Sequence, residues 1–469
     1  MRDEPRRDWI AVGLITLAGL GLRIAAARGG LWLDEAWSAV NAQEVGTALG
    51  VFLRINHDNN HHLNTLWLQL VGLDASPVVQ RGLSIATGTL SIPLAALIAS
   101  RQSAGTAVTA AILFAISPLL VTYGAEARGY APMLFFLLIA VLLTARWLDD
   151  TSARVPAIPL FLAVLMGMFS QLTCVFGLVA IGLWVGWALL RSRKPKRALV
   201  DGARVLAPMA LAAGLAIGVV LGAAHAAGTG LQVGSYTPFT FAKLGEGLGA
   251  LMLSTFGGPV ALVAALVLLA PPDSPGDAAG VARDRSFFLF ALLIPVGVVL
   301  LQLGNSGAPR YLLLSGMGAV MLAAVHTAPR LAAGYRWRWP VIVALSVVIV
   351  ASLVTDWRIA VNRRADPAAA IDAMVARAPG GAEVAVGFSR SAAVLQAGVA
   401  ARRYPIRIVE APCPATRFLY LDRNGGDPFP AVATRCGSRY HEIAGARPTG
   451  LSGLPWKLYE RDEAPVAGR

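Results

Sequence analysis

Residues 174–190 read CVFGLVAIGLWVGWALL, residues 191–197 read RSRKPKR, and residues 203–224 read ARVLAPMALAAGLAIGVVLGAA. Each of the two apolar segments is about as long as a helix must be to cross the hydrocarbon core of a bilayer. The loop between them is short and strongly basic, and such loops remain on the cytoplasmic side of a membrane. The stretch therefore predicts two transmembrane helices that are joined inside the cell.

Apolar segments of this kind make up most of the first 355 residues. The whole chain of 469 residues is 56% hydrophobic and 14% charged, whereas soluble domains have about 25% charged residues. We therefore expect an α-helical polytopic membrane protein with about eleven transmembrane helices. They are predicted at residues 9–27, 78–99, 105–123, 131–148, 156–172, 174–190, 203–224, 247–270, 286–303, 311–326 and 340–355.

The net charge of +13 could indicate a nucleic-acid-binding protein. We interpret it instead as an orientation signal, because many basic residues lie in the short loops between apolar segments, and we expect no nucleic-acid partner. The segment 9–27 follows Arg2, Arg6 and Arg7 and is too long for a cleaved signal peptide. We expect it to be a retained first helix whose N-terminus is cytoplasmic.

The composition changes after about residue 355. Strand-length apolar runs alternate there with helix-like segments at 366–378 and 389–401, which predicts a small α/β domain. The sequence thus predicts a transmembrane domain at 1–355 and a second domain at 356–469. An odd number of spans places this second domain outside the cytoplasm.

The chain has three cysteines. Cys174 lies in an apolar segment, whereas Cys413 and Cys436 lie in the C-terminal domain. In an oxidising compartment these two can form a disulfide. Two unpaired thiols remain the alternative, because the sequence does not show whether their Cα atoms are close enough to be bridged.

The first outer loop, residues 28–77, begins with LWLDEAWS at 31–38. Its adjacent carboxylates, Asp34 and Glu35, could be solvated acids within an interfacial belt of aromatic side chains. A carboxylate that is half shielded from water is also a good general base for the hydroxyl of a sugar acceptor. Further along, the segment 62–72 is apolar but too short to span a bilayer, so we expect a juxtamembrane helix.

The same loop also contains a group of histidines. Three of the six histidines of the chain lie within six residues, beside Asp58. Such a group can hold a divalent metal or bind a phosphate. The spacing matches no closed zinc site, and we favour hydrogen bonds from His61 and His62 to a sugar or a phosphate.

Two further outer turns carry charges at membrane depth, where charges are costly unless paired or functional. Glu126 and Arg128 lie between two apolar runs, and Arg310 begins a late helix. A guanidinium in such a place can bind a phosphate through two hydrogen bonds. The alternatives are a Glu126–Arg128 pair that locks two helices and an Arg310 side chain that merely snorkels. Because acids, histidines and arginines all lie on one side, we expect one shared site.

Four short motifs occur in order along the chain: WLDEA at 32–36, HHLN at 61–64, EARGYA at 126–131 and PRY at 309–311. With these motifs the chain resembles the GT-C superfamily of membrane glycosyltransferases, in particular the bacterial branch related to protein mannosyltransferases and lipid A aminoarabinose transferases. The resemblance covers residues 1–355. It departs from the family at His62 and Leu63, which replace the usual prolines. It departs again at Asn59 and Asn60, where related enzymes can carry an acid that contacts a metal, and this second departure puts a metal requirement in doubt.

The resemblance implies a hexosyl- or pentosyltransferase of the bacterial inner membrane. Such an enzyme would transfer a sugar, with inversion, from a polyprenyl-phosphate donor to a glycan, lipid or protein acceptor at the outer face. Asp34 would be the general base, Glu35 would be secondary, and the lipid phosphate would leave. The resemblance assigns donor binding to His61, His62, Glu126, Arg128, Tyr130, Arg310 and Tyr311. A divalent metal ion is a candidate cofactor, with Asp58, His61 and Glu126 as candidate ligands.

Two other functions are compatible with a polytopic membrane protein. A lipid or polysaccharide transporter or flippase would place charges near the bilayer midplane and often contains repeated halves. Here the charges lie in outer loops and no repeat is visible. A large outer loop in the second half of the chain would favour a surface-polysaccharide polymerase or ligase. The outer stretch 225–246 is only moderate in length.

Overall fold

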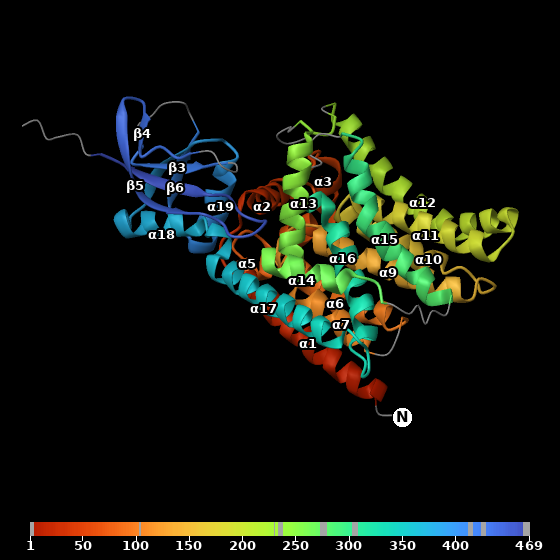
Figure 1. The fold of residues 1–469 in the computed structure, drawn as a ribbon. Coiled ribbons are helices and arrows are strands. Elements are labelled where there is room, and N and C mark those ends of the chain that lie inside the picture. The colour runs from red at the N-terminus through yellow and green to blue at the C-terminus, as the bar shows by residue number, and fades with distance from the viewer. Residues whose placement is uncertain are drawn as a thin grey trace, which may run out of the picture.

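The structure is a computed structural model that describes residues 4–462, except 103–104, 229, 233–237, 273–278, 303–307, 411–415 and 424–427. A large helical part is followed by a smaller region built around a β-sheet (Figure 1). The helices up to the sheet region are α1 (Glu4–Ala26), α2 (Leu33–Glu44), α3 (Ala48–Leu53), α4 (His62–Val71), α5 (Pro77–Gln80), α6 (Gly82–Ala99), α7 (Thr106–Ile116), α8 (Pro118–Tyr123), α9 (Tyr130–Asp149), α10 (Ala157–Ser170), α11 (Cys174–Ser192), α12 (Pro195–Ala226), α13 (Phe241–Phe256), α14 (Pro259–Leu269), α15 (Ala279–Val299), η1 (Pro309–Leu312), α16 (Leu313–Arg330) and α17 (Arg338–Asn362).

Each of the eleven apolar segments predicted to span the membrane contains a helix. Among the described residues, seven helices are long and apolar enough to cross a membrane, and an eighth span forms if α13 and α14 count as one helix bent by 79°. The segment predicted at 105–123 is divided because Pro118 begins a new helix after Ser117, as proline does at a first helical turn. The expected α-helical polytopic membrane protein is therefore confirmed, with some spans shorter or more broken than the sequence suggested.

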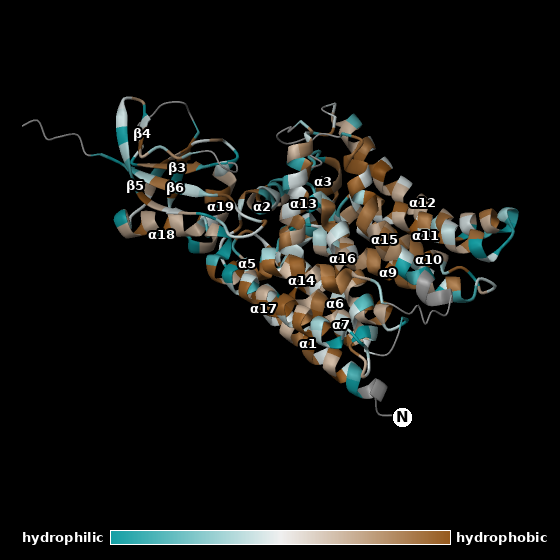
Figure 2. Ribbon diagram, in the orientation of Figure 1, coloured by the Kyte–Doolittle hydropathy of each residue, from teal (hydrophilic) through white to brown (hydrophobic). Residues whose placement is uncertain are grey.

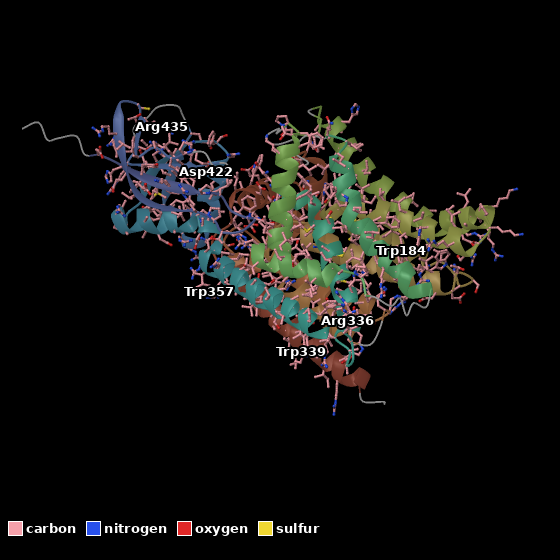
Figure 3. The ribbon with its side chains drawn as sticks, in the orientation of Figure 1. Trp184, Arg336, Trp339, Trp357, Asp422 and Arg435 are labelled. Carbon is pink, nitrogen blue, oxygen red and sulfur yellow. The ribbon has the colours of Figure 1, made fainter. Side chains whose placement is uncertain are left out.

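The outermost helices show how the protein meets lipid. Apolar side chains dominate the long helices, whereas polar residues gather at their ends and in the sheet region (Figure 2). On α17, Trp339 and Trp357 are 72% and 64% exposed and lie toward opposite ends of the helix (Figure 3). The rise between them is about 27 Å, close to the thickness of a bilayer core, and tryptophan is enriched at both membrane interfaces. We infer that these two residues mark the two faces of the membrane.

The segment predicted as a juxtamembrane helix at 62–72 is helix α4. It packs against α2 and lies between α3 and α10. Thus the loop 28–77 folds into short helices rather than forming an extended connection. Of the residues expected to form the site, Asp34, Glu35 and His62 lie on these helices. Asp58 and His61 lie in the connection between α3 and α4.

The C-terminal region has the mixed α/β structure that the sequence predicted. Its elements are η2 (Arg363–Ala365), α18 (Ala368–Arg377), β1 (Ala382–Val386), α19 (Ser391–Arg402), β2 (Ile406–Val409), β3 (Phe418–Asp422), β4 (Val432–Arg435), β5 (Ser438–Ala446) and β6 (Trp456–Arg461). The strand order is β2-β1-β3-β6-β5-β4. The strand β1 pairs in parallel with β2 and β3, and the other pairs are antiparallel. The division into domains at residue 355 stays a prediction, since α17 continues to Asn362.

Several contacts join this region to the helical part, and two of them involve α19 and Arg364. Helix α19 packs against α2, with Ala393, Val394 and Ala397 in one apolar cluster with Leu33 and Ala36. The packing is close because most of these side chains are small. Helix α2 is therefore covered by the C-terminal region along one face.

The second contact is a buried arginine. The Arg364 side chain is 1% exposed and donates hydrogen bonds to the carbonyl oxygens of Ala26 (2.5 Å), Thr122 (3.2 Å) and Ala125 (2.7 Å). Carbonyl groups at helix ends have no partner within their own helix. Arg364 supplies one for α1 and α8, and it fixes the C-terminal region to their ends.

The cysteines agree in part with the expectation from the sequence. Cys174 is a free and buried thiol. Cys436 is disulfide-bonded. Its expected partner Cys413 lies outside the described residues, so the pairing stays a prediction.

The orientation of the protein can be tested with reporter fusions. We expect alkaline phosphatase fused after residue 462 to be active, because the basic loops 191–197 and 331–338 hold the opposite ends of the helices in the cytoplasm. A fusion that ends at Lys194 should instead be inactive as a phosphatase and fluorescent as a green fluorescent protein. The reverse pattern at the two positions would contradict the orientation.

Candidate active site

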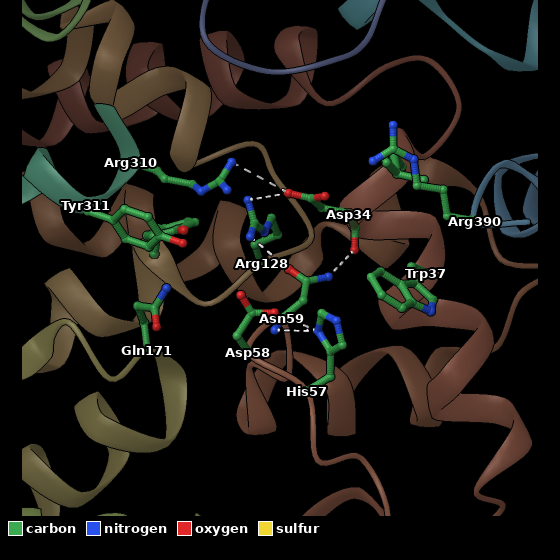
Figure 4. Close-up of a pocket in the computed structure, with 12 residues that line it drawn as sticks. Asp34, Trp37, His57, Asp58, Asn59, Arg128, Gln171, Arg310, Tyr311 and Arg390 are labelled. Atoms are coloured by element: carbon green, nitrogen blue, oxygen red, sulfur yellow. Dashed lines mark hydrogen bonds and ion pairs between the residues drawn. The ribbon is translucent and has the colours of Figure 1, made fainter. Parts of the chain in front are cut away.

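A polar pocket lies where the short helices of the first loop meet α9, η1 and the C-terminal region (Figure 4). It encloses about 590 Å³. It is lined by Leu33, Asp34, Trp37, His57, Asp58, Asn59, Arg128, Tyr130, Gln171, Arg310, Tyr311 and Arg390. Of the residues predicted from the sequence, Asp34, Asp58, Arg128, Tyr130, Arg310 and Tyr311 line this pocket.

Asp34 lies between two arginines. Its Oδ2 is 3.0 Å from Nη1 of Arg128 and 3.9 Å from Nη1 of Arg310. Asn59 completes the arrangement, since it accepts a hydrogen bond from Arg128 Nη2 (2.8 Å) and donates one to the backbone carbonyl of Asp34 (2.8 Å). The carboxylate and both guanidinium groups, far apart in the sequence, therefore lie together in one place.

Arg128 is the more buried of the two arginines, at 5% side-chain exposure. Its guanidinium lies over the rings of Tyr130 (5.0 Å) and Trp32 (5.8 Å). Burial alone would lower the pKa of Arg128, but Tyr130 and Asp34 raise it, and the net shift is upward. Arg128 is therefore a fixed positive charge in the wall of the pocket.

His61 contacts the guanidinium group of Arg128 but does not line the pocket. Burial, together with the charge of Arg128, holds the pKa of His61 well below its usual value, so the imidazole is neutral. Its Nδ1 donates to the carbonyl of Ser170 (3.2 Å), and its Nε2 then accepts from Arg128 Nε (3.3 Å). The sequence predicted His61 as a donor-binding residue, and its contacts here are those of a residue that positions Arg128.

Glu35 does not face the pocket, although it follows Asp34 in the chain. It is fully buried and paired with Arg81, whose Nε and Nη2 donate to its two carboxylate oxygens (2.8 and 2.5 Å). It also accepts from the backbone N–H groups of Ala127 (2.6 Å) and Trp32 (3.2 Å). Burial raises the pKa of Glu35, but Arg81 more than offsets this and the net shift is downward. The sequence suggested a secondary catalytic acid, and the structure shows a buried ion pair.

Glu126 also lies away from the pocket. Its Oε1 accepts hydrogen bonds from Trp32 Nε1 (3.0 Å) and from Ser452 Oγ (2.8 Å). Its pKa is raised, because burial outweighs the opposing effect of Arg128. Glu126 therefore joins the outer loop to the C-terminal region. These contacts are not those of the Glu126–Arg128 pair, and the donor-binding and metal-binding roles suggested by the sequence stay predictions.

The metal candidates do not converge. Asp58 Oδ1 lies 2.8 Å from His57 Nδ1, whereas His61 and Glu126 contact Arg128 and Trp32 as described above. In the described ranges of the chain there is no group of three His, Cys, Asp or Glu side chains that could hold a metal ion. A metal requirement stays a prediction, and these three residues do not form one ligand set.

A second cavity of about 720 Å³ adjoins the polar pocket. Its apolar wall includes Phe52, Leu172, Val220 and Leu231, and His62 lies in it as well. The His62 ring stacks on Phe52 with 5.0 Å between the centroids. The two cavities share a wall, which consists of His57, Asp58, Gln171 and Tyr311.

Three residues that shape the site were missed from the sequence. Arg81 had a signal, because it is a charged residue within the apolar segment predicted at 78–99, and such charges are usually structural or functional. Gln171 had a weak signal, because it is a polar residue near the end of the apolar segment predicted at 156–172. Arg390 had none. Only the folded chain brings them to the pocket.

Comparison with known proteins shows the fold. No protein-family model and no curated protein matches the sequence. The structure is similar to a crystal structure of ArnT from Cupriavidus metallidurans in the apo state, with a TM-score of 0.55 over 87% of this chain and 86% of that one. The sequence identity is 12%, so the similarity concerns architecture. It supports the GT-C-like fold and a multi-pass membrane protein.

We expect Glu35→Gln to destabilise the protein rather than to act on chemistry. Glutamine keeps the shape but leaves the Arg81 charge buried without its counter-charge, which typically costs about 3–5 kcal/mol. The melting temperature of the purified protein should fall clearly, whereas Glu44→Gln, at the exposed end of the same helix, should leave it unchanged. A Glu35→Gln protein of normal stability but low turnover would instead support a catalytic role.

The buried histidines predict that stability depends on pH. Burial lowers the pKa of His62 from 6.5 to about 4, so between these values the unfolded chain binds a proton that the folded chain does not. Stability is then lost as the pH falls, by up to about 1.4 kcal/mol per pH unit. His62→Phe keeps the aromatic stack and should reduce the dependence of melting temperature on pH between 6.5 and 4, and His61 contributes to the dependence that remains. His225→Phe, at an exposed position, should not, and equal slopes for both variants would refute this interpretation.

Proposed function

We propose that this protein is a GT-C glycosyltransferase that moves a sugar from a polyprenyl-phosphate donor to the hydroxyl of an acceptor. The observation that carries the proposal is the Asp34 carboxylate placed between Arg128 and Arg310 in a polar pocket. The fold supports it, because ArnT is an aminoarabinose transferase of the GT-C superfamily. We further propose that the site faces the outer side of a bacterial inner membrane.

The two adjoining cavities suit the two chemical parts of such a donor. The polar pocket offers guanidinium groups, which bind phosphate with planar, bidentate geometry. The adjoining cavity offers Phe52, Leu172, Val220 and Leu231, which suit the apolar tail. A donor whose phosphate lies near Arg128 and Arg310 could pass its prenyl chain across the shared wall.

The chemistry requires one bond to form and one to break. The acceptor oxygen attacks the anomeric carbon opposite the phosphate, so the anomeric configuration inverts, and the bond from that carbon to the phosphate oxygen breaks. The hydroxyl proton passes to the Asp34 carboxylate. Negative charge grows on the leaving polyprenyl phosphate, and fixed positive charges beside it lower the barrier without reorganisation. Arg128 and Arg310 would supply these charges.

Without a donor, the Asp34 carboxylate itself contacts the guanidinium groups of Arg128 and Arg310. A carboxylate engaged in this way is poorly available as a base. A donor phosphate would compete for both guanidinium groups and would release Asp34 toward the acceptor. We therefore expect the donor to bind before the acceptor.

Asp34→Asn tests the proposal. General-base removal should lower turnover by a factor of about 10² to 10⁴. Because the competing internal carboxylate charge is also removed, polyprenyl phosphate should bind more tightly, by about three- to tenfold. Transfer can be followed with radiolabelled polyprenyl-phosphate sugar and membrane extract as acceptor source, and binding by tryptophan fluorescence in nanodiscs.

Asp74→Asn is the matched control, since Asp74 lies exposed in the same outer loop and should change neither quantity. Near-normal transfer by Asp34→Asn would place the base elsewhere. If Arg128→Lys and Arg310→Lys each left donor binding unchanged, the phosphate would not bind at this pair. Loss of both transfer and donor binding in Asp34→Asn would contradict the competition between the carboxylate and the phosphate.

A further inference from the structure

One lining residue of the polar pocket comes from outside the helical part. Arg390 lies immediately before α19 in the C-terminal region, whereas the other lining residues come from the chain between Leu33 and Tyr311. The C-terminal region thus does more than pack beside the pocket. It contributes a charged side chain to it.

The topology of the sheet explains why this turn reaches the pocket. Strand β1 lies between β2 and β3, and all three are parallel. The connection from β1 leads to β2 on one side, while β3 lies on the other. The crevice outside the carboxyl ends of parallel strands, where the connections diverge in this way, is where open α/β sheets bind ligands. Residues 387–390 occupy that position.

Helix α19 packs against the helical part, and the crevice therefore faces that part of the molecule. The helix contacts α2 through Ala393, Val394 and Ala397, and α2 is the helix that carries Asp34. The turn is held in place by Ser391, whose hydroxyl donates to Asp422 at the end of β3 (2.9 Å). Asp422 is 1% exposed, so this hydrogen bond is shielded from water. Arg390 is therefore presented from a fixed turn.

The three arginines of the pocket lie in two separate positions. Arg128 and Arg310 lie on one side of Asp34, and Arg390 lies on the other side, next to Trp37 (Figure 4). Three arginines and two aspartates line the pocket, and Asp58 lies beside His57. One donor phosphate can satisfy Arg128 and Arg310. Asp34 stands between Arg390 and Arg310 in this view (Figure 4), so the two guanidinium groups face different parts of a bound ligand.

We propose that Arg390 binds an anionic group, a phosphate or a carboxylate, on the acceptor, close to the hydroxyl that receives the sugar. This assignment rests on the proposed function. In an inverting displacement the base lies beside the attacking hydroxyl, on the face of the anomeric carbon opposite the leaving phosphate. Asp34 is that base in the proposed function, and Arg390 lies on the side of Asp34 away from Arg128 and Arg310 (Figure 4), which is the acceptor side. Trp37 offers an aromatic face beside it, and the ring of Trp37 is held by His57 at 4.2 Å between centroids.

The experiment uses full-length protein in nanodiscs that contain only uncharged or zwitterionic lipid, and two soluble probes. Glycerol 3-phosphate carries a hydroxyl beside a phosphate, and glycerol lacks the anion. Binding of each is measured by saturation-transfer NMR, first on protein loaded with polyprenyl phosphate and then on protein without polyprenyl phosphate. We expect glycerol 3-phosphate to bind the loaded protein and glycerol not to bind.

Arg390→Gln should weaken the binding of glycerol 3-phosphate by about tenfold, as the loss of one charge-assisted hydrogen bond does, and should leave the binding of polyprenyl phosphate unchanged. Arg390→Lys should have a smaller effect, because it keeps the charge but loses the planar fork. Arg407→Gln is the matched control, since Arg407 lies on the edge strand β2 and pairs with Glu383. It should behave as the wild type does, and equal melting temperatures exclude misfolding.

The two proposals fail in different ways. If polyprenyl phosphate does not bind the wild-type protein, the proposed function is wrong. The measurement without polyprenyl phosphate still tests whether Arg390 binds an anion. If polyprenyl phosphate binds but Arg390→Gln and Arg407→Gln bind glycerol 3-phosphate equally well, the role of Arg390 is wrong. The same conclusion follows if the loaded wild-type protein binds glycerol as well as it binds glycerol 3-phosphate.

Discussion

The buried ion pair of Glu35 and Arg81 is the constraint on which the site depends. Arg81 also donates to the carbonyl oxygens of Ala27 and Gly29, and Glu35 accepts from Ala127, so the pair joins α1, α2 and the turn before α9. Consecutive side chains on a helix point about 100° apart. Because Glu35 is fixed toward the interior, its neighbour Asp34 must face the pocket. The direction of the functional carboxylate is therefore set by a residue that never meets a substrate.

A second layer of contacts fixes the positive charge. Arg128 is held by Asn59 on one side and by the neutral ring of His61 on the other, and His61 is in turn oriented by Ser170 at the end of α10. None of these groups can neutralise the guanidinium. Its charge is preserved and its direction fixed before any ligand arrives, which is the arrangement that stabilises charge developing in a transition state.

The sequence predicts what is encoded by neighbouring residues. Apolar segments gave the helices, alternating short runs gave the α/β region, and four motifs indicated which outer turns meet. The roles of Glu35 and Glu126 could not be predicted, because their partners Arg81 and Ser452 are 46 and 326 residues away. Local patterns show that an acid is present. Only packing decides whether it faces a cavity or a buried guanidinium.

The two arginine positions belong to parts of the chain whose cores are separate except along α19. The helices around Arg128 and Arg310 pack in one apolar cluster. Strand β1 and the sheet beside Arg390 pack in another, and α19 shares a third cluster with α2. Substitutions in the turn 387–390 can therefore alter one wall of the pocket while the opposite wall keeps its shape. Over evolutionary time, related proteins could then change the reactant that contacts one wall while the opposite wall continues to bind the other reactant. The same separation makes the turn a natural place for protein engineers to begin.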